Sequence, residues 1–455
     1  MKTIKTFCLI IGSGAAGLEA GISFLKNFST SKKEIKKCII VSPIISNSRI
    51  SPWNIMDCSE KEIKEKIWNA GNHLSDPEIL KTFSENHKHS ISILKELEIP
   101  LKKSNIGYIP CLSGTNIINI FEKKFISLGG ERINGFVEKY LVNQEGIIKG
   151  AVVYHGNERI NLIASKIIIA SGGLTSLYKY TTGYSYDSMP NILALSLEAG
   201  IALENLEFNM FHPFLIIDKN LSTSLISGEI LQKGKYADNK GKEFLSKEIK
   251  DALINNTFHS LFPKMVNEFY TQSLKSKIYM DISNLSDDYF ERYKKENEFG
   301  WIFKNKKLNE VKKFEIHPAF HYSIGGIKIN SKSETNQEGV YAAGEVTTGL
   351  HGANRIGGFA ISEALVFGKI AGENAAANIT LPKEDNLTVI GNSLIDSRIK
   401  NIFWNNLGPI KKYKDLESLK TKISLKNNLS SEEKLVLEII KSSIKRRSIG
   451  ANFII

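Results

Sequence analysis

The sequence predicts an α/β fold built around a parallel sheet, with a second domain inserted into it, and three observations support this prediction. A fully apolar strand near the N-terminus runs directly into a glycine-rich turn, as strands buried on both faces of a parallel sheet do. Far along the chain, another short apolar strand runs into a second glycine-rich turn. The long segment between them has a different pattern, which indicates an insertion.

The first glycine-rich turn has the pattern and the position of a dinucleotide site. Residues 7–11 (F-C-L-I-I) form the apolar strand, G-S-G-A-A-G follows, and a helical pattern continues to residue 25 before a second strand at 38–41. Glycine permits a tight turn, a close approach of the backbone to a pyrophosphate, and close packing of helix on strand. The predicted contacts come from Gly12, Gly14, Ala15, Ala16 and Gly17.

The ribose contact expected of a nicotinamide site is missing. Such sites carry an acidic residue at the end of the second strand, but here that strand ends at Ser42 and Pro43. The later strand, residues 339–343, leads instead into Gly344 and Glu345, and Glu345 is a candidate for the ribose contact. We therefore predict that the two glycine-rich turns hold one large dinucleotide between them, and that the chain has no free NAD site.

The second glycine-rich turn also carries groups suited to a carboxylate. Residues 317–372 contain His321, His351 and Arg355, and an Ala-rich helix starts at about Gly358. An arginine fork matches a carboxylate with two hydrogen bonds, and the first N–H groups of a helix attract anions. The alternative is a plain strand–turn–helix with surface charges, which the matching turn near the N-terminus disfavours.

The motifs together resemble one known family. The stretch G-E-V-T-T-G-L-H-G-A-N-R (344–355), preceded by H-Y-S-I-G-G-I (321–327), resembles the flavoprotein family of succinate dehydrogenase, fumarate reductase and L-aspartate oxidase. The similarity extends to I-I-I-A-S-G-G (167–173), to E-F-N-M-F-H-P (207–213) and to K-R-R-S-I-G-A-N-F (445–453). The resemblance implies bound FAD and exchange of a hydride between flavin N5 and a four-carbon dicarboxylate.

The resemblance also implies roles for individual residues. Arg355 is expected to clamp one substrate carboxylate, with hydrogen bonds from His212 and His321; the alternative for His212 is a core histidine beside aromatic residues. The family's proton-transferring arginine, found in a P-R-D stretch, has no direct counterpart, and Lys264 in F-P-K-M stands nearest to its place. Lysine is a point charge without the planar fork of arginine, so this replacement is a hypothesis. Further cofactor contacts are implied for Ser42, Ser48, Ala170, Gly172, Gly344, Glu345 and Ser362.

The loop after the second strand predicts non-covalent FAD. Some family members attach the flavin to a histidine there, but residues 44–55 contain no histidine, and Asn47 stands about where it would be. In the family, a long polar segment at this place reaches the substrate. In this chain the corresponding segment, residues 99–115, is short and mostly apolar or neutral. The identity of the dicarboxylate is therefore left open by the sequence.

Composition restricts the class of protein. The chain has 455 residues, 42% of them hydrophobic, which suits a large core in two or three domains. The net charge of +12 comes from dispersed lysines, a pattern typical of solvated faces and not of a nucleic-acid site. The four cysteines lack C-x-x-C spacing, so we expect reduced thiols, and His73, His87 and His89 are expected on the surface. With no apparent signal peptide or transmembrane run, a cytoplasmic protein is expected.

The predicted architecture is a Rossmann-like FAD-binding domain with an inserted α+β capping domain and a C-terminal helical domain. The predicted boundaries are 1–190 and 319–381 for the two parts of the FAD-binding domain, 191–318 for the capping (substrate) domain, and 382–455 for the helical domain.

The predicted function is that of an FAD-dependent oxidoreductase acting on a C4 dicarboxylate. An L-aspartate oxidase, which forms iminoaspartate, is favoured because the chain is short and lacks the flavin-linking histidine. The first alternative is a fumarate reductase or succinate dehydrogenase flavoprotein, and the second is a flavin-binding subunit without dicarboxylate chemistry. The electron acceptor (oxygen, fumarate or a quinone) is left open.

Overall fold

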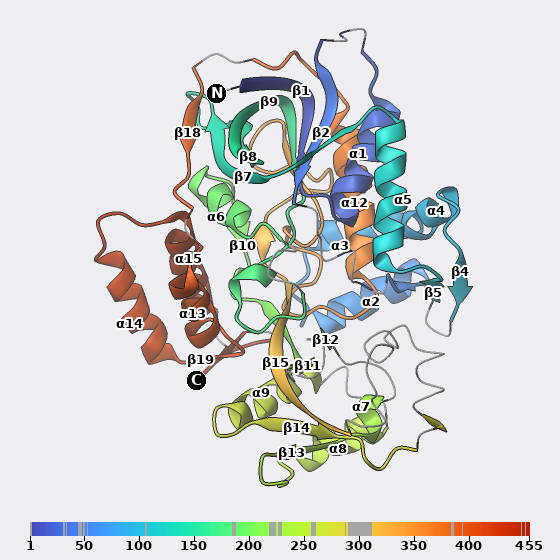
Figure 1. Cartoon of the computed structure of the whole chain (residues 1–455), viewed down its shortest axis with the longest axis vertical. Helices are drawn as coiled ribbons and strands as arrows, with labels where there is room; N and C mark the ends of the chain where they lie inside the picture. The colour runs from blue at the N-terminus through green and yellow to red at the C-terminus, as the bar shows by residue number, and fades with distance from the viewer. Residues whose placement is uncertain are drawn as a thin grey trace.

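A computed structural model shows how these segments are arranged (Figure 1). It describes residues 2–30, 32, 34–43, 48, 51, 53–104, 107–183, 188–217, 224–225, 230–255, 261–286, 288–289, 312–383, 386–393, 395–446, 448–450 and 452–455. Asn47 lies outside the described residues.

The N-terminal strand is central to the larger sheet, as predicted. β1 (Lys2–Ile11) pairs in parallel with β2 (Lys36–Ser42) on one side and with β9 (Glu158–Ile169) on the other. β17 (Val340–Ala342) pairs in parallel with the carboxyl end of β9. The sheet runs in the order β18-β7-β8-β9-β1-β2-β6, and its other strands are β6 (Glu131–Asn134), β7 (Phe136–Val142), β8 (Ile148–His155) and β18 (Thr388–Ile390).

Three helices stand beside this sheet in Figure 1: α1 (Ala15–Asn27), α5 (Gly114–Ser127) and α12 (Ala360–Ala375). The backbones of α1 and α12 approach each other closely at Gly372. A Cβ at this position would lie only 2.2 Å from the carbonyl oxygen of Ala20. This packing joins the first helix of the chain to the helix that follows the second glycine-rich turn.

The segment that contains His73, His87 and His89 forms α2 (Glu60–Ala70), α3 (Pro77–Asn86) and α4 (His89–Glu96). One expectation here was wrong, because His87 is buried and contacts the rings of Phe83 and Phe359 edge-on. His89 is partly buried and lies 2.9 Å from a carboxylate oxygen of Glu19. Strands β3 (Ile55–Met56), β4 (Leu101–Lys103) and β5 (Gly107–Pro110) form a small neighbouring sheet.

The inserted segment forms a second, antiparallel sheet with its own hydrophobic core, below the first in Figure 1. Its order is β12 (Ser224–Leu225), β11 (Asn209–Ile216), β15 (Lys313–Ser323), β14 (Ile278–Asp281) and β13 (Lys235–Asp238). Helices α7 (Ile230–Lys233), α8 (Lys247–Ile254) and α9 (Phe262–Ser273) accompany it. The fold class, a parallel-sheet FAD-type domain with an α+β insertion, is therefore as predicted, whereas the domain boundaries stay a prediction.

The C-terminal segment is helical, with α13 (Ser397–Asn406), α14 (Tyr413–Ser424) and α15 (Ser431–Lys445). α15 packs on α6 (Asn191–Glu198), and a capping box between Ser430 and Glu433 starts it. Short strands complete the fold: β10 (Leu203–Glu204), β16 (Gly326–Ile327), β19 (Ile410–Lys411) and β20 (Phe453–Ile454).

The structure bears on two further expectations. All four cysteines are free thiols. No helix in the described part of the chain combines the length and apolarity needed to cross a bilayer.

Candidate active site

The two glycine-rich turns meet at the carboxyl ends of the parallel strands of the larger sheet. β1 and β17 end level with each other, because Ile11 and Ala342 both pair with Ile169 of β9. Gly12 has a φ of +115°, and a Cβ there would lie 2.1 Å from the carbonyl oxygen of Ala170. The carboxyl ends of parallel strands are the usual binding edge of such sheets. The structure thus brings Gly12, Ala170 and Gly344 together, as a shared dinucleotide site requires.

The start of α1 has the properties of an anion site. Its N-cap, Gly14, offers no side-chain cap, and the backbone N–H of Ala15 donates to the hydroxyl of Ser48 at 3.1 Å. Ser48 comes from the loop after β2, so a residue named from the sequence does reach this helix terminus. Ser42, in contrast, donates its hydroxyl to the carbonyl of its neighbour Pro43 at 3.0 Å.

Several buried polar atoms around these turns have no partner among the described residues. They are the hydroxyl oxygens of Ser13, Ser171 and Ser362. Buried hydroxyls are normally hydrogen-bonded, so orphaned ones beside a glycine cradle fit a polar ligand. The residues present therefore fit a bound FAD. The contacts predicted for Gly12, Gly14, Ala15, Ala16, Gly17, Ala170, Gly172, Gly344 and Ser362 stay a prediction.

Glu345 links the cofactor turn to the inserted sheet. Its carboxylate accepts the backbone N–H of Ser323, the last residue of β15, at 3.0 Å. Burial raises the pKa of this carboxyl to about 7, against the stabilising hydrogen bonds from Ser323 and Gly173. The predicted ribose contact of Glu345 stays a prediction.

Arg355 is buried in the loop between β17 and α12. Its guanidinium carbon lies 4.5 Å from the ring centroid of Tyr322. Among the described residues it donates a single hydrogen bond, 3.4 Å from Nη1 to the carbonyl of Ile356, and its buried Nε has no partner. A buried guanidinium has five donors to satisfy, so Arg355 has spare donors for an anionic ligand.

His212 on β11 and His321 on β15 lie close together, with ring centroids 5.5 Å apart. The Nδ1 of His212 accepts the backbone N–H of Phe214 at 3.2 Å, so in the neutral ring the proton sits on Nε2. His321 contacts the hydroxyl of Thr182 at 2.8 Å. Burial, with the nearby charges of Arg355 and His212, holds the pKa of His321 well below its usual range. The structure therefore brings together three of the four predicted substrate residues, and His321 is neutral at pH 7.

Lys264 is placed elsewhere. It stands in the first turn of α9, is about half exposed, and forms an ion pair with Glu248 of α8. No contact in the described part of the chain joins it to His212, His321 or Arg355. Its neighbour Phe262 does reach the site, with its ring 5.1 Å from that of His212.

Two residues of the site were not identified from the sequence. Tyr322 and Glu363 are buried, and the Tyr322 hydroxyl donates to the Glu363 carboxylate at 2.6 Å. The same oxygen of Glu363 lies 3.1 Å from Nε2 of His351. The available signal was a carboxylate among apolar residues in the first turn of α12.

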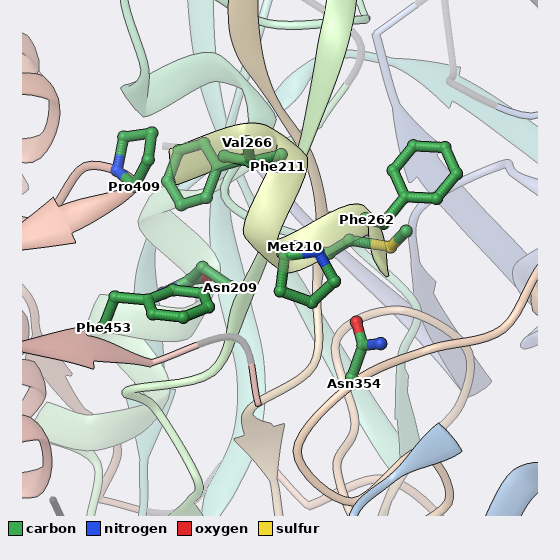
Figure 2. A pocket seen from close by; sticks show the side chains of 9 residues that line it. Asn209, Met210, Phe211, Phe262, Val266, Asn354, Pro409 and Phe453 are labelled. Atoms are coloured by element: carbon green, nitrogen blue, oxygen red, sulfur yellow. The ribbon is translucent and has the colours of Figure 1, made fainter. Parts of the chain in front are cut away.

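An apolar pocket borders the site (Figure 2). Three of its lining residues adjoin the site residues. Met210 lies on β11 near His212, the ring of Phe262 is 5.1 Å from that of His212, and Asn354 directly precedes Arg355. Figure 2 shows Pro409 and Phe453 of the C-terminal segment on its opposite side. The inserted sheet, the arginine loop and the C-terminal segment therefore share one pocket. Its lining is Asn209, Met210, Phe211, Phe262, Pro263, Val266, Asn354, Pro409 and Phe453.

The fold and the site define an FAD-binding oxidoreductase, and comparison with known proteins agrees. A family model described as FAD binding domain matches residues 66–361, and the chain belongs to this family. It is similar to an L-aspartate oxidase of Pyrococcus horikoshii, 28% identical over 98% of this chain and 94% of that protein. It is also similar to a fumarate reductase (CoM/CoB) polypeptide of Methanothermobacter marburgensis, 23% identical over 91% of this chain and 84% of that protein.

Among solved structures, a quinol–fumarate reductase with menaquinol molecules superposes with a TM-score of 0.80 at 17% identity, covering 100% of this chain and 93% of that chain. At this identity the likeness concerns the fold. The resemblance noted in the sequence, to the flavoproteins of succinate dehydrogenase, fumarate reductase and L-aspartate oxidase, is confirmed.

Proposed function

We propose that this protein oxidises L-aspartate to iminoaspartate at a non-covalently bound FAD. The observation that carries the proposal is the buried guanidinium of Arg355, with spare hydrogen-bond donors, beside His212 and His321. Burying such a cation is costly, and a carboxylate bound by its fork offsets that cost. The aspartate oxidase of Pyrococcus horikoshii, matched over nearly its whole length, supports the choice of substrate.

The residues of the chain act mainly by binding and orientation. Arg355 holds one carboxylate of the substrate, and His212 donates a hydrogen bond from Nε2 to the other. His321 is neutral, so it adds a hydrogen bond and no charge. FAD, when bound, supplies the two-electron acceptor. Holding the substrate in one orientation at that cofactor converts an encounter into an effectively unimolecular step.

The proton-transferring role of Lys264 remains a hypothesis from the sequence, and the proposal does not depend on it. Comparing Lys264→Gln with Glu248→Gln tests it, because both variants break the same ion pair. A proton-transferring lysine predicts a loss of about a hundredfold or more in turnover for Lys264→Gln alone. Equal and small effects of the two variants would remove Lys264 from the mechanism.

A fumarate reductase or succinate dehydrogenase flavoprotein is the second candidate. The sequence R-I-G-G-F-A-I-S-E around the start of α12 is more like soluble fumarate reductases, and the relative from Methanothermobacter marburgensis supports this alternative. The two functions differ in the substrate that exchanges electrons with the flavin, which is L-aspartate in the first and succinate or fumarate in the second. The acceptor of the oxidase reaction is oxygen, fumarate or a quinone.

Anaerobic titration of the purified flavoprotein tests the proposal. L-aspartate and succinate are added to separate samples, and the flavin absorbance is recorded. Bleaching by L-aspartate alone is the expected result. Bleaching by succinate, with no response to L-aspartate, would favour the second candidate. An intact flavin spectrum that responds to no C4 dicarboxylate would instead support a flavin-binding subunit without this chemistry.

A further inference from the structure

Three buried side chains adjoin Arg355 and its loop, and the proposed function assigns them no role. Tyr322 follows His321 on β15, His351 lies in the loop that carries Arg355, and Glu363 is in the first turn of α12. Their side chains are connected, since the Tyr322 hydroxyl donates to Glu363 at 2.6 Å and His351 lies 3.1 Å from the same carboxylate oxygen.

This connection joins the two parts of the active site. Tyr322 belongs to a strand of the inserted sheet, whereas His351 and Glu363 belong to the segment around the cofactor turn. One oxygen of Glu363 thus holds the tyrosine ring and the arginine loop at a fixed separation. The ring is also packed at its edge against His351, with centroids 5.8 Å apart.

The tyrosine ring in turn supports the arginine. The guanidinium carbon of Arg355 lies 4.5 Å from the ring centroid of Tyr322, within the range of a cation–π contact. Few other contacts fix the guanidinium, because among the described residues its hydrogen bond to Ile356 is long, at 3.4 Å, and Nε is unpartnered. A phenol that donates to a carboxylate has a more electron-rich ring, which strengthens its attraction for a cation.

We infer that Tyr322, Glu363 and His351 form a positioning assembly that fixes the plane of the Arg355 guanidinium for a carboxylate ligand. The inference rests on the proposed carboxylate site at Arg355. Tyr322 supplies the surface on which the guanidinium lies, Glu363 holds the tyrosine, and His351 holds Glu363. None of the three needs to touch the ligand, so each acts through Arg355.

Malonate titration of the FAD-loaded protein, followed by flavin absorbance and by calorimetry, tests this inference. Malonate is a dicarboxylate that cannot undergo the proposed oxidation, so its Kd reports binding alone. We expect Tyr322→Leu to weaken malonate binding by about tenfold, within the range of a lost cation–π contact. Tyr322→Phe keeps the ring and loses the bond to Glu363, and we expect about threefold weaker binding.

Two variants of Glu363 separate the effect of its hydrogen bond from the effect of its charge on malonate binding. Glu363→Gln keeps an acceptor for the tyrosine hydroxyl, so malonate binding should weaken by about threefold, whereas Glu363→Ala should approach the tenfold loss of Tyr322→Leu. Glu373→Ala is the matched control, because Glu373 lies on the same helix in a partly exposed pair with Lys369. The control should leave the Kd for malonate unchanged.

A double-mutant cycle distinguishes positioning from general loosening of the site. If Tyr322 acts through Arg355, Tyr322→Leu changes the malonate Kd by less than about twofold in an Arg355→Ala background. A tenfold loss in both backgrounds would overturn the inference, as would wild-type affinity in Tyr322→Leu. FAD content and thermal midpoint are measured on every variant, and Tyr322→Phe keeps the test decisive if Tyr322→Leu does not fold.

The inference and the proposed function fail in different ways. Wild-type protein that holds FAD but binds neither malonate nor any C4 dicarboxylate would refute the proposed site, and with it the basis of the inference. Wild-type protein that binds malonate, with unchanged Kd values in the Tyr322 and Glu363 variants, would refute the inference alone.

Discussion

Glu345, at the start of the second glycine-rich turn, accepts a hydrogen bond from the backbone N–H of Ser323, the last residue of β15, at 3.0 Å. Because β15 also carries His321, this bond connects the cofactor edge of the large sheet to a predicted substrate residue. The carboxyl is buried, and its pKa is raised to about 7. The free energy of unfolding should therefore depend on whether Glu345 is protonated.

The first prediction concerns pH. Because the pKa of Glu345 is raised in the folded state, the folded protein retains this proton after the unfolded chain has lost it. Stability of the FAD-free protein should therefore fall as the pH rises from about 4.5 to about 7, by roughly 1–3 kcal/mol from this group. Urea unfolding at several pH values measures the effect. Glu345→Gln should flatten the curve, and the exposed Glu338→Gln should not; parallel curves for all three proteins would contradict the prediction.

The second prediction concerns the first glycine-rich turn. Gly12→Ala would place a Cβ 2.1 Å from the carbonyl oxygen of Ala170, in addition to the strain of a φ of +115°. We expect a loss of roughly 3 kcal/mol or more in unfolding free energy, and loss of FAD. Gly200→Ala is the matched control, since Gly200 has a φ of +80° and nothing within 4 Å of the added carbon. It should lose only about 1 kcal/mol and keep its FAD.

Full FAD content in Gly12→Ala, with stability like that of Gly200→Ala, would show that the turn tolerates the clash. FAD is measured from the flavin absorbance of the purified protein relative to its absorbance in the aromatic band.

The sequence predicted the two buried strands and the glycine-rich turns that follow them, because their signals are local. An apolar run followed by glycines reports a buried strand and a tight turn whatever lies around it, and residues 12–17 and 344–345 were found in this way. The segment at residues 382–455 was likewise predicted to be helical, and α13, α14 and α15 lie there.

Contacts between distant segments were harder to predict. His87 has polar neighbours in sequence, but Phe359 of a remote segment covers it, so it was wrongly expected on the surface. Tyr322 and Glu363 have no local pattern that connects them, and their hydrogen bond depends on how β15 meets α12. Lys264 was chosen by its position in a motif, and the structure shows its ion pair with Glu248.

The third prediction concerns Arg355. Arg355→Lys keeps a positive charge but loses the planar fork and Nε, the donor that has no partner among the described residues. The Kd of the FAD-loaded protein for malonate should rise by about tenfold to a hundredfold, because a charge-assisted hydrogen bond is worth roughly 1.5–3 kcal/mol. Flavin absorbance measures both the Kd and the FAD content, which should not change. Arg159→Lys is the control, since Arg159 is exposed, pairs with Glu138 and lies at the amino end of β9, opposite to the end where the glycine-rich turns meet. Equal Kd values in both variants would remove Arg355 from the ligand site.

The last prediction concerns the junction of the C-terminal segment with the strand that carries His212. The buried carboxylate of Glu207 pairs with Nε of Arg446 at 2.7 Å and accepts the Ser442 hydroxyl at 2.5 Å. Lys411 is fully buried beside it, and its pKa is lowered to about 8 by burial, against the attraction of Glu207. Glu207 is therefore the buried negative charge that balances Lys411 and the partly exposed Arg446.

Removing this charge should destabilise the protein far more than removing an exposed one nearby. Glu207→Gln should lower the unfolding free energy by roughly 3 kcal/mol, because it leaves the ammonium of Lys411 buried without a counter-charge. Glu204→Gln breaks a pair with Lys328 whose side chains are 48% and 55% exposed, and it should change stability by less than about 1 kcal/mol. Urea unfolding of both variants at pH 7 gives the comparison. Similar small changes in the two would mean that the C-terminal helices are held on β11 by apolar packing, and that the buried ion pair contributes no net stability.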